Sequence, residues 1–222
     1  MASQTKENYI KAIYHLHQID QDISLSAIGE ELGVSKPTAN NMIKKLEAEG
    51  FVAYEKYKPI RITKKGKKFA AEIVRRHRLS EMFLTQIMGF GWEEVHEIAE
   101  ELEHINPEKF FDRMDEMLGF PKIDPHGSPI PDKDGEIATR QYFPLSEATA
   151  GKSYIVKSLK SSGSDLLVFL NEKNIQLQTI IKVHKIEDFD GVMTVSYGEY
   201  EHEVLSAAVS DLLLVEEIAH EK

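Results

Sequence analysis

The sequence predicts a mainly α-helical protein that begins with a winged helix-turn-helix and ends in a small β domain. Three observations support this fold class. Helical periodicity prevails in the first half of the chain, a Gly-containing turn separates two short N-terminal helices, and an alternating pattern typical of strands begins at Lys152. We expect three domains, over residues 1–72, 73–140 and 141–222.

The composition is that of a globular protein without disulfides. The chain has 222 residues, of which 41% are apolar, and it has no cysteine, which excludes disulfide bonds and thiolate metal ligands. No apolar run is long enough to span a membrane, and the N-terminus lacks an apolar signal region. These features predict a soluble protein with a cytoplasmic address.

The net charge of −10 is unevenly distributed along the chain. Residues 1–80 carry 15 basic and 9 acidic side chains, whereas the remainder carries 12 basic and 28 acidic ones. The segment 36–68 alone holds 10 basic and 3 acidic residues. A basic segment in an otherwise acidic chain indicates one surface that binds a polyanion.

The N-terminal residues predict a helix-turn-helix. A helix over residues 7–19 is followed by a short one, with Ser24 or Ser26 as its cap and Gly33 at its end. Ser35 can cap the next helix, in which Pro37 lies in the first turn and which runs to Gly50. Two ordinary packed helices are the alternative interpretation of this pattern alone.

Residues 51–63 predict two short strands around a basic tip, which is a wing. A wing beside a helix-turn-helix with this local charge predicts binding to double-stranded DNA. The start of the second helix would then face base edges, and nearby basic residues would neutralise phosphates or serve only for solubility. The expected base-reading residues are Ser35, Lys36, Pro37, Thr38, Asn40 and Asn41. The expected phosphate contacts are Lys44, Lys56, Lys58, Arg61, Lys64, Lys65, Lys67 and Lys68.

A helix opened by Trp92 carries residues with metal-ligating groups. His96, Glu100, Glu103 and His104 stand at positions i, i+4, i+7 and i+8, so they would share one helix face. The preceding helical stretch offers His77 and Glu81 at i and i+4. Imidazole and carboxylate ligands suit Mn²⁺, Fe²⁺, Zn²⁺ or Co²⁺. A solvated, Glu-rich helix face is the alternative.

The middle of the chain is rich in apolar helical segments. We expect one helix from Thr63 to Arg78, a separate one from Leu79 to Ile87, and a third that restarts at Asn106-Pro107. Their large apolar side chains exceed what a thin helical layer can bury, which indicates a homodimer interface. An ordinary core within one subunit is the alternative.

The C-terminal part predicts a β-barrel-like domain. A proline-punctuated loop over residues 120–131 and a linker over 132–151 precede it. Asp190-Gly191 is typical of a hairpin turn, and residues 164–170 predict one short helix. The expected strands are residues 153–160, 175–186, 192–197 and 212–217.

The chain resembles the diphtheria-toxin-repressor-like, metal-dependent transcription repressors, which include the manganese transport regulators. The resemblance covers nearly the whole chain and implies a winged-helix domain, a helical dimerisation domain and a C-terminal SH3-like barrel. It also implies a homodimer that binds a palindromic operator when loaded with Fe²⁺ or Mn²⁺ and represses metal-uptake genes. The motifs that carry the resemblance are Val34-Ser35-Lys36-Pro37-Thr38, Arg76-His77-Arg78-Leu79-Ser80-Glu81, Val95-His96, Glu103-His104, Pro125-His126-Gly127 and Ile130-Pro131.

The resemblance also assigns metal ligands by position. The principal site corresponds to Asn8, Glu100, Glu103 and His104, and the second site to His77, Glu81 and His96. In the longer manganese-responsive members, residues at Asp124, His126 and near Asp165 join the second site with Glu81. Two residues depart from the family pattern. Asn8 stands where Asp or Met is usual, and Lys11 replaces a carboxylate of the short manganese regulators, which argues against a tightly bridged two-metal cluster.

The ligand types favour Mn²⁺, because Glu100 stands where the iron sensors of the family have Cys. Fe²⁺ is the alternative, with Zn²⁺ or Co²⁺ as substitutes in vitro. Two other classes compete with this interpretation, a metalloenzyme and a metal-independent winged-helix regulator. The stretch from His96 to Glu100 lacks the second His of a zinc-protease motif, and both Glu-x-x-His pairs fall on one helix rather than on two. We therefore expect no enzymatic activity.

Overall fold

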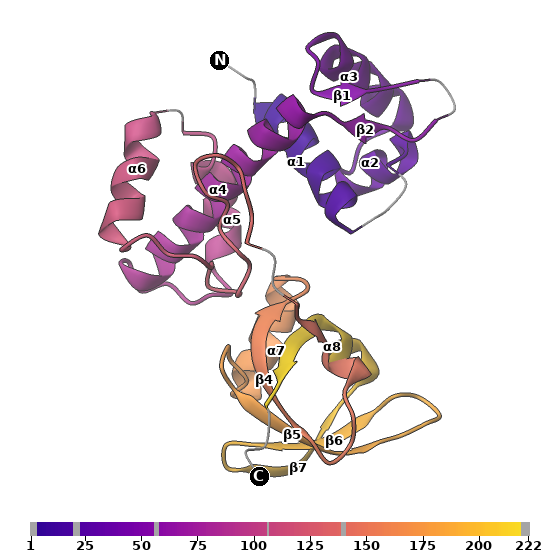
Figure 1. The fold of residues 1–222 in the computed structure, drawn as a ribbon, viewed down its shortest axis with the longest axis vertical. Helices are drawn as coiled ribbons and strands as arrows, with labels where there is room; N and C mark the ends of the chain where they lie inside the picture. Colours follow the sequence, from indigo (N-terminus) through magenta and orange to yellow (C-terminus); the bar gives the residue numbers. More distant parts are fainter. Residues whose placement is uncertain (1–3, 20–22, 56–57, 106, 139–140, 219–222) are drawn as a thin grey trace. The chain divides into compact units, whose positions relative to one another are not determined.

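The computed structural model describes residues 4–19, 23–55, 58–105, 107–138 and 141–218. The chain forms two compact units. Figure 1 shows the helices and strands that make them up. Unit 1 comprises residues 1–80, 99–122 and 130–137, and unit 2 comprises residues 81–98, 123–129 and 138–222. Within the described residues, no helix has both the length and the apolar composition needed to cross a membrane.

Three helices open unit 1: α1 (Gln4–Gln18), α2 (Leu25–Glu31) and α3 (Lys36–Ala48). Serine caps fix the starts of α2 and α3. Ser24 Oγ accepts a hydrogen bond from Ala27 N at 3.0 Å, and Ser35 Oγ accepts one from Thr38 N at 3.3 Å. Such caps contribute about 1 kcal/mol each. Gly33 turns the chain between α2 and α3 with φ of +63°, a value that favours glycine. The predicted helix-turn-helix is confirmed.

A short hairpin forms the wing, in which β1 (Val52–Ala53) pairs antiparallel with β2 (Arg61–Ile62). The start of the hairpin packs closely against the helix that follows. The approach is so close that a Cβ atom at Gly66 would lie 2.1 Å from Phe51 O. Apolar side chains from the three helices and the wing form one core. Its fully buried members include Ile13, Ile28, Ile43 and Leu46.

The helices that follow are α4 (Lys64–Gln86), α5 (Val95–Leu102) and α6 (Glu108–Met117), and α4 and α5 each contribute residues to both units. The expectation of two helices between Thr63 and Ile87 is wrong. No glycine or proline interrupts the chain after Gly66 in this stretch, so α4 is continuous through Arg78 and Leu79.

The boundaries of α5 and α6 also differ from those expected. A turn precedes α5, which begins at Val95 rather than at Trp92 and ends before Glu103. The cap position of α6 is Pro107, without a side-chain hydrogen bond, and Asn106 lies outside the described residues. Glu103 and His104 therefore stand on the turn that follows α5, and they can point to other partners than an unbroken helix face would allow.

The C-terminal part of unit 2 is an antiparallel six-stranded sheet in the order β3-β8-β4-β5-β6-β7. Figure 1 labels β4 to β7 of this sheet. Its core includes Tyr154, Val156, Ile181, Val183 and Val195. The strands are β3 (Phe143–Pro144), β4 (Ser153–Leu159), β5 (Ile180–Ile186), β6 (Met193–Tyr197), β7 (Tyr200–Leu205) and β8 (Leu213–Glu217). The predicted small β domain is confirmed.

Two helices and a 3-10 turn complete the sheet, namely α7 (Ser164–Glu172), α8 (Ala207–Leu212) and η1 (Leu145–Glu147). Leu167 and Leu170 on α7 are buried in the core of the sheet. The expected linker over residues 132–151 is partly wrong, because β3 and η1 lie within it. β7 and α8 were not expected, and the strand expected from Ile175 begins only at Ile180.

Candidate metal centres and nucleic-acid interface

The first cluster of polar side chains lies in unit 1, around the carboxylate of Glu103. This carboxylate is fully buried, and it accepts hydrogen bonds from Lys11 and His77. Lys11 on α1 donates to its two oxygens at 2.7 and 2.9 Å, and His77 Nδ1 donates to Oε2 at 2.7 Å. Positive charge and donated hydrogen bonds are what a buried carboxylate requires. The interpretation of this stretch as a merely solvated face therefore fails at Glu103.

His104 in the same cluster is oriented by a carboxylate. Its Nδ1–H donates to Glu7 Oε2 at 2.5 Å, so the lone pair of the neutral ring is on Nε2. Nε2 is buried and has no hydrogen-bond partner among the described residues, and the same is true of Asn8 Oδ1 on α1. Buried polar atoms without partners are rare and call for an explanation, of which a bound ion is one. A carboxylate that fixes the tautomer of a ligating histidine is a common arrangement at metal sites.

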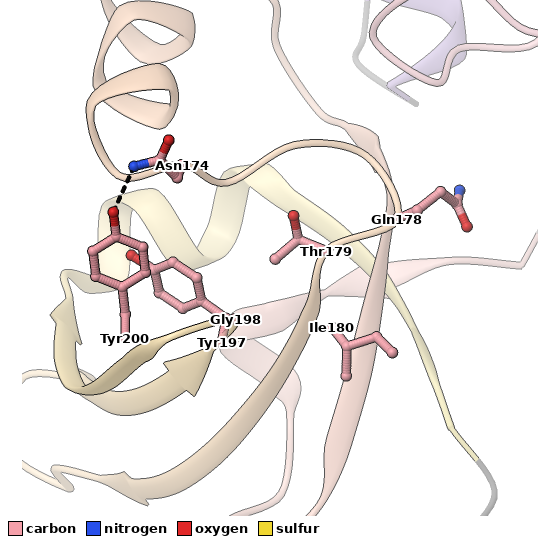
Figure 2. Close-up of a pocket in the computed structure, with 7 residues that line it drawn as sticks. All are labelled: Asn174, Gln178, Thr179, Ile180, Tyr197, Gly198 and Tyr200. Carbon is pink, nitrogen blue, oxygen red and sulfur yellow. Dashed lines mark hydrogen bonds between the residues drawn. The ribbon is translucent and has the colours of Figure 1, made fainter.

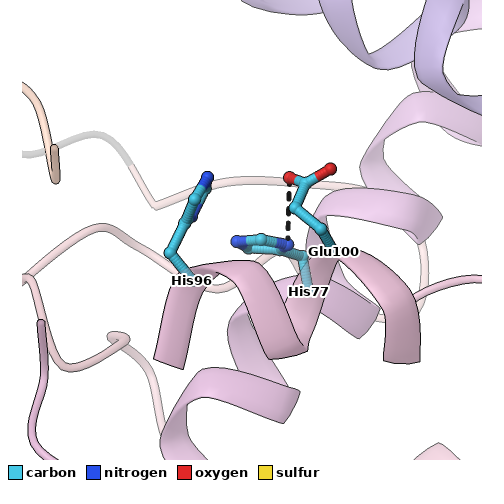
Figure 3. A group of neighbouring side chains, drawn as sticks. All are labelled: His77, His96 and Glu100. Carbon is cyan, nitrogen blue, oxygen red and sulfur yellow. Dashed lines mark ion pairs between the residues drawn. The ribbon is translucent and has the colours of Figure 1, made fainter. Parts of the chain in front are cut away.

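Glu100 borders this cluster and is more exposed than Glu103. Its Oε1 accepts a hydrogen bond from Lys11 Nζ at 2.5 Å. Figure 3 shows His77 on α4 facing Glu100 on α5, with an ion pair of 3.6 Å between Nδ1 and Oε1. His96 stands one helical turn before Glu100 on α5. The expected principal-site carboxylates and His77 therefore lie together, with Glu7 and Lys11 added from α1.

The second cluster lies in unit 2 and consists of Glu81, Asp124 and His126. One ligand atom from each lies within 4.8 Å of the others, and all three side chains are buried. His96 extends the cluster, because its Nδ1 lies 3.4 Å from Glu81 Oε1. Two carboxylates and one or two imidazoles, without sulfur, suit a divalent ion such as Mn²⁺, Fe²⁺ or Zn²⁺.

His126 is held by Trp92. Its Nε2–H donates to the carbonyl oxygen of Trp92 at 2.9 Å, and the two rings stack with centroids 6.0 Å apart. This leaves Nδ1 facing Glu81 Oε2 at 3.7 Å. Burial disfavours the imidazolium, but the interaction with the Glu81 carboxylate, the charge of Asp124 and the hydrogen bond to Trp92 O together outweigh burial and raise the pKa of His126. A metal ion bound through Nδ1 would have to displace the proton that this raised pKa favours.

The loop that carries Asp124 and His126 packs directly on β4. His126 O accepts a hydrogen bond from Leu159 N at 2.9 Å, and Asp124 Oδ1 accepts from the backbone N–H groups of His126 and Ser128. Gly127 has φ of +85° and lies so close to β4 that a Cβ atom would stand 2.2 Å from Lys157 O. The C-terminal sheet therefore fixes the position of two members of the second cluster.

Sequence reasoning missed several supporting residues, and one residue that it named is exposed. Asp165 is exposed in the first turn of α7 and is not among the three residues of the second cluster. Glu7 and Trp92 were not singled out as site residues. No spacing rule points to Glu7, because it is 97 residues from His104 along the chain.

The start of α3 presents an exposed polar surface in unit 1. Lys36, Pro37, Thr38 and Asn41 are exposed there, as is Lys44 one turn later. Asn40 differs, because its Oδ1 accepts a hydrogen bond from Tyr54 OH at 3.2 Å. Ser35 is also occupied within the fold, as the cap of α3. Thr38 Oγ1 lies 2.8 Å from Ser35 Oγ, within hydrogen-bond distance. Lys36, Pro37 and Asn41 are therefore better placed to approach base edges, whereas Ser35 and Asn40 support the helix and the wing.

The basic residues around the wing fall into two groups. Arg61, Lys64, Lys67 and Lys68 are exposed on β2 and the first turns of α4. Other lysines are engaged within unit 1: Lys65 Nζ donates to Glu49 O at 2.8 Å, and Lys58 pairs with Glu55 at 2.5 Å. Lys56 lies outside the described residues. The first group is the better suited to phosphate contacts.

A hollow in the C-terminal sheet is a different kind of surface (Figure 2). Asn174 Nδ2 donates to Tyr200 OH at 2.6 Å across one side of it. Its lining has no carboxylate or imidazole, so it differs in chemistry from the two clusters described above. The lining residues are Asn174, Gln178, Thr179, Ile180, Tyr197, Gly198 and Tyr200.

Comparison with known proteins finds matches to three domain families, which together cover most of the chain. Residues 1–60 match the iron dependent repressor, N-terminal DNA binding domain, and residues 63–132 match the iron dependent repressor, metal binding and dimerisation domain. Residues 143–217 match the FeoA domain. The first cluster combines α1 from the first match with residues of α4 and α5 from the second.

Individual relatives agree with these matches. The iron-dependent repressor IdeR of Mycobacterium bovis is 33% identical over 127 residues, which are 57% of this chain but only 55% of that protein. The diphtheria toxin repressor of Corynebacterium glutamicum is 31% identical over 168 residues, which are 76% of this chain and 72% of that protein.

A solved structure agrees over the whole fold. It is a manganese-dependent transcriptional repressor in complex with manganese, with a TM-score of 0.86 and 31% identity. The match covers 96% of this chain and 100% of that one. The relatives named here are all repressors. The chain therefore belongs to the iron-dependent repressor family of metal-dependent, DNA-binding transcription repressors, of which the diphtheria toxin repressor is a member.

Proposed function

We propose that this protein is a Mn²⁺-activated repressor that binds a palindromic operator as a homodimer and controls metal-uptake genes. The single observation that carries the proposal is the first cluster. There, His104 Nε2 lies 3.7 Å from the buried carboxylate of Glu103. Neither this nitrogen nor the buried Asn8 Oδ1 on α1 has a hydrogen-bond partner among the described residues. An amide oxygen, a carboxylate and an imidazole nitrogen fit a divalent cation, so the residues present suit the expected group.

The residues that would hold the cation in the first cluster are Asn8, Glu100, Glu103 and His104. In the second cluster they are Glu81, Asp124 and His126, with His96 beside them. Of the two other positions named from the sequence, His77 contacts Glu103 in the first cluster, and we propose Asp165 as an exposed contributor to the second site. When bound, the cation supplies positive charge that these oxygen and nitrogen donors share. The chain supplies the second layer of contacts, from Glu7 to His104 and from Trp92 O to His126.

The first cluster joins the two matched domains of unit 1. Asn8 belongs to the DNA-binding match, and Glu103 and His104 belong to the metal-binding and dimerisation match. Donors on both sides restrain α1 relative to the end of α5 when they share one cation. A shift from a mostly inactive to a mostly active arrangement requires about 5.5 kcal/mol of differential binding, which a few ligands can supply.

Two observations support the remaining parts of the proposal. Phe110, Met117 and Phe120, on and just after α6, are exposed by 41%, 53% and 56% of their surface, which favours burial in a dimer. Lys36, Pro37, Thr38 and Asn41 are exposed at the start of α3, where a winged helix reads the major groove. A homodimer presents this helix twice, and the expected operator therefore has two related half-sites.

The choice of Mn²⁺ over Fe²⁺ is supported by the ligand types. Glu100 offers a hard carboxylate, the chain has no thiolate, and the manganese-dependent relative shares its fold. Raw affinity would favour later metals, so selection has to come from coordination number and geometry.

The test is a metal-by-metal DNA-binding titration. A duplex is first selected from a randomised pool by the protein with Mn²⁺, and its affinity is then measured by fluorescence anisotropy. Each ion is compared at the same free concentration, with Fe²⁺ under anaerobic conditions and with a chelator as control. Binding with Mn²⁺ and its loss with the chelator are expected. Activation of DNA binding by Fe²⁺ but not by Mn²⁺ would contradict the choice of metal. DNA binding that is unchanged by the chelator would contradict metal regulation.

A further inference from the structure

Lys11 lies among the candidate metal ligands of the first cluster, although its ammonium group cannot itself bind a metal cation. Its ammonium donates to Glu100 Oε1 at 2.5 Å and to Glu103 Oε1 and Oε2 at 2.7 and 2.9 Å. An ammonium has three donors, and here they meet three carboxylate oxygens. The side chains of Lys11, Glu100 and Glu103 are 22%, 35% and 0% exposed, so the group is largely shielded from water.

The charge of Lys11 compensates carboxylates that would otherwise stand alone. Glu103 is fully buried, and a buried carboxylate without a cation is strongly unfavourable. His77 supplies a second hydrogen bond to Glu103, but an imidazole carries positive charge only when protonated. Lys11 is therefore the ammonium partner of Glu103 among the described residues.

An ammonium and a divalent cation cannot use the same oxygens at the same time. The lone pairs that accept hydrogen bonds from Lys11 are those that a metal ion would need. An ammonium and a metal ion beside the same carboxylate oxygens would also repel each other. The lysine stem is long and flexible, and the side chain is already partly exposed, so the ammonium can withdraw into solvent.

We propose that Lys11 is a tethered competitor of the metal ion for Glu100 and Glu103, and so sets the metal concentration at which the first cluster fills. The inference rests on the proposed function, because it takes Glu100 and Glu103 as metal ligands. In the metal-free protein Lys11 keeps α1 attached to α5, and it gives up these contacts when the cluster takes its cation.

The test measures Mn²⁺ affinity of the full-length protein by isothermal titration calorimetry. His126→Ala serves as the parent, because loss of this imidazole weakens the second cluster and leaves the first cluster to dominate the titration. Lys11→Met and Lys11→Gln remove the charge in this parent, and Lys11→Arg retains it. Lys6→Gln is the matched control, since Lys6 is a lysine of the same helix that pairs with Glu49 instead.

Loss of the Lys11 charge is expected to tighten Mn²⁺ binding about tenfold or more, because the metal no longer has to displace a charged hydrogen-bond donor. Lys11→Arg and Lys6→Gln are expected to stay near the parent. In chelator, Lys11→Met is also expected to melt at a lower temperature than the parent, and added Mn²⁺ is expected to narrow that difference. The rise in melting temperature caused by Mn²⁺ is therefore expected to be larger for Lys11→Met than for the parent. This measurement does not depend on DNA binding.

Unchanged or weaker Mn²⁺ binding by both Lys11→Met and Lys11→Gln would overturn the inference. If either variant is unfolded in chelator, its refolding with Mn²⁺ is followed by circular dichroism, and failure to refold would equally overturn it. The outcome for the proposed function is separate. If neither the His126→Ala parent nor the wild type binds Mn²⁺ in the calorimeter, the proposed metal sites themselves are contradicted, and not only the role of Lys11.

Discussion

Glu7 on α1 accepts a 2.5 Å hydrogen bond from Nδ1 of His104, a residue that follows α5. The two side chains come from segments matched to different domains, and both are largely buried. Their contact determines which nitrogen of His104 carries the proton. It also directs the other nitrogen, Nε2, into a buried environment without a hydrogen-bond partner among the described residues. Glu7 is therefore a positioning residue for the first cluster.

Replacement of Glu7 by Gln is expected to weaken Mn²⁺ binding by roughly 10- to 100-fold, the usual effect of removing a carboxylate behind a ligating histidine. The measurement is calorimetric titration in the His126→Ala parent. Glu31→Gln is a matched control, because Glu31 forms a similar pair with His15 at 2.9 Å on an exposed surface. Equal Mn²⁺ affinity of the Glu7 and Glu31 variants would contradict this role of Glu7.

Trp92 offers a signal specific for the second cluster, because it is the only tryptophan of the chain and its ring stacks on His126. Mn²⁺ is paramagnetic, so its binding beside His126 is expected to quench Trp92 fluorescence. Asp124→Asn is expected to shift this quenching to higher Mn²⁺ concentration, while Glu103→Gln leaves it in place. Quenching that depends on Glu103 but not on Asp124 would contradict the assignment of the second cluster.

Gly127 is expected to tolerate no side chain. A Cβ atom there would collide with Lys157 O and Ser158 Cα on β4, at 2.2 and 2.6 Å. Gly151 is the matched control, because its φ of +89° is similar and no atom lies within 4 Å of its Cβ position. We expect Gly127→Ala to lower the free energy of unfolding by about 1–3 kcal/mol more than Gly151→Ala does. Equal losses in urea denaturation would show that the loop does not need this close approach.

The DNA-binding surface separates base readers from phosphate contacts. Asn41→Ala is expected to cost about 1–3 kcal/mol of binding and to relax the sequence preference, since an exposed Asn can bond adenine bidentately. Lys67→Ala is expected to weaken binding to all sequences alike and to reduce the salt slope by about 1. Anisotropy titrations over a range of salt concentrations test both. An Asn41 variant with unchanged affinity and preference would rule out this placement of α3.

Much of the fold could be predicted from local signals. Ser24, Gly33 and Ser35 mark the turns of the helix-turn-helix, because caps and left-handed turns depend on neighbouring residues only. β7 was missed because Tyr200-Glu201-His202-Glu203 lacks the alternation of a half-buried strand, and β7 is an edge strand of the sheet. The continuous α4 shows that an apolar stretch does not divide into two helices without a residue that breaks it.

The site was less accessible to sequence reasoning than the fold. Spacing along one helix nominates Glu100, Glu103 and His104 by their chemistry, and the resemblance adds Asn8. It cannot show that Lys11 holds two of these carboxylates or that Glu7 orients His104, because both contacts span about 90 residues of sequence or more. Such contacts depend on how α1 packs in unit 1, which no periodicity encodes.

The central claim is that the first cluster makes DNA binding depend on a divalent cation. The most direct measurement compares wild type with Glu103→Gln in their affinity for the selected duplex, as free Mn²⁺ is varied. Circular dichroism and sedimentation confirm beforehand that the variant is folded and dimeric. We expect wild type to gain affinity as Mn²⁺ rises, and Glu103→Gln to lose most of that gain. A variant that keeps the same Mn²⁺-dependent affinity as wild type would contradict the account.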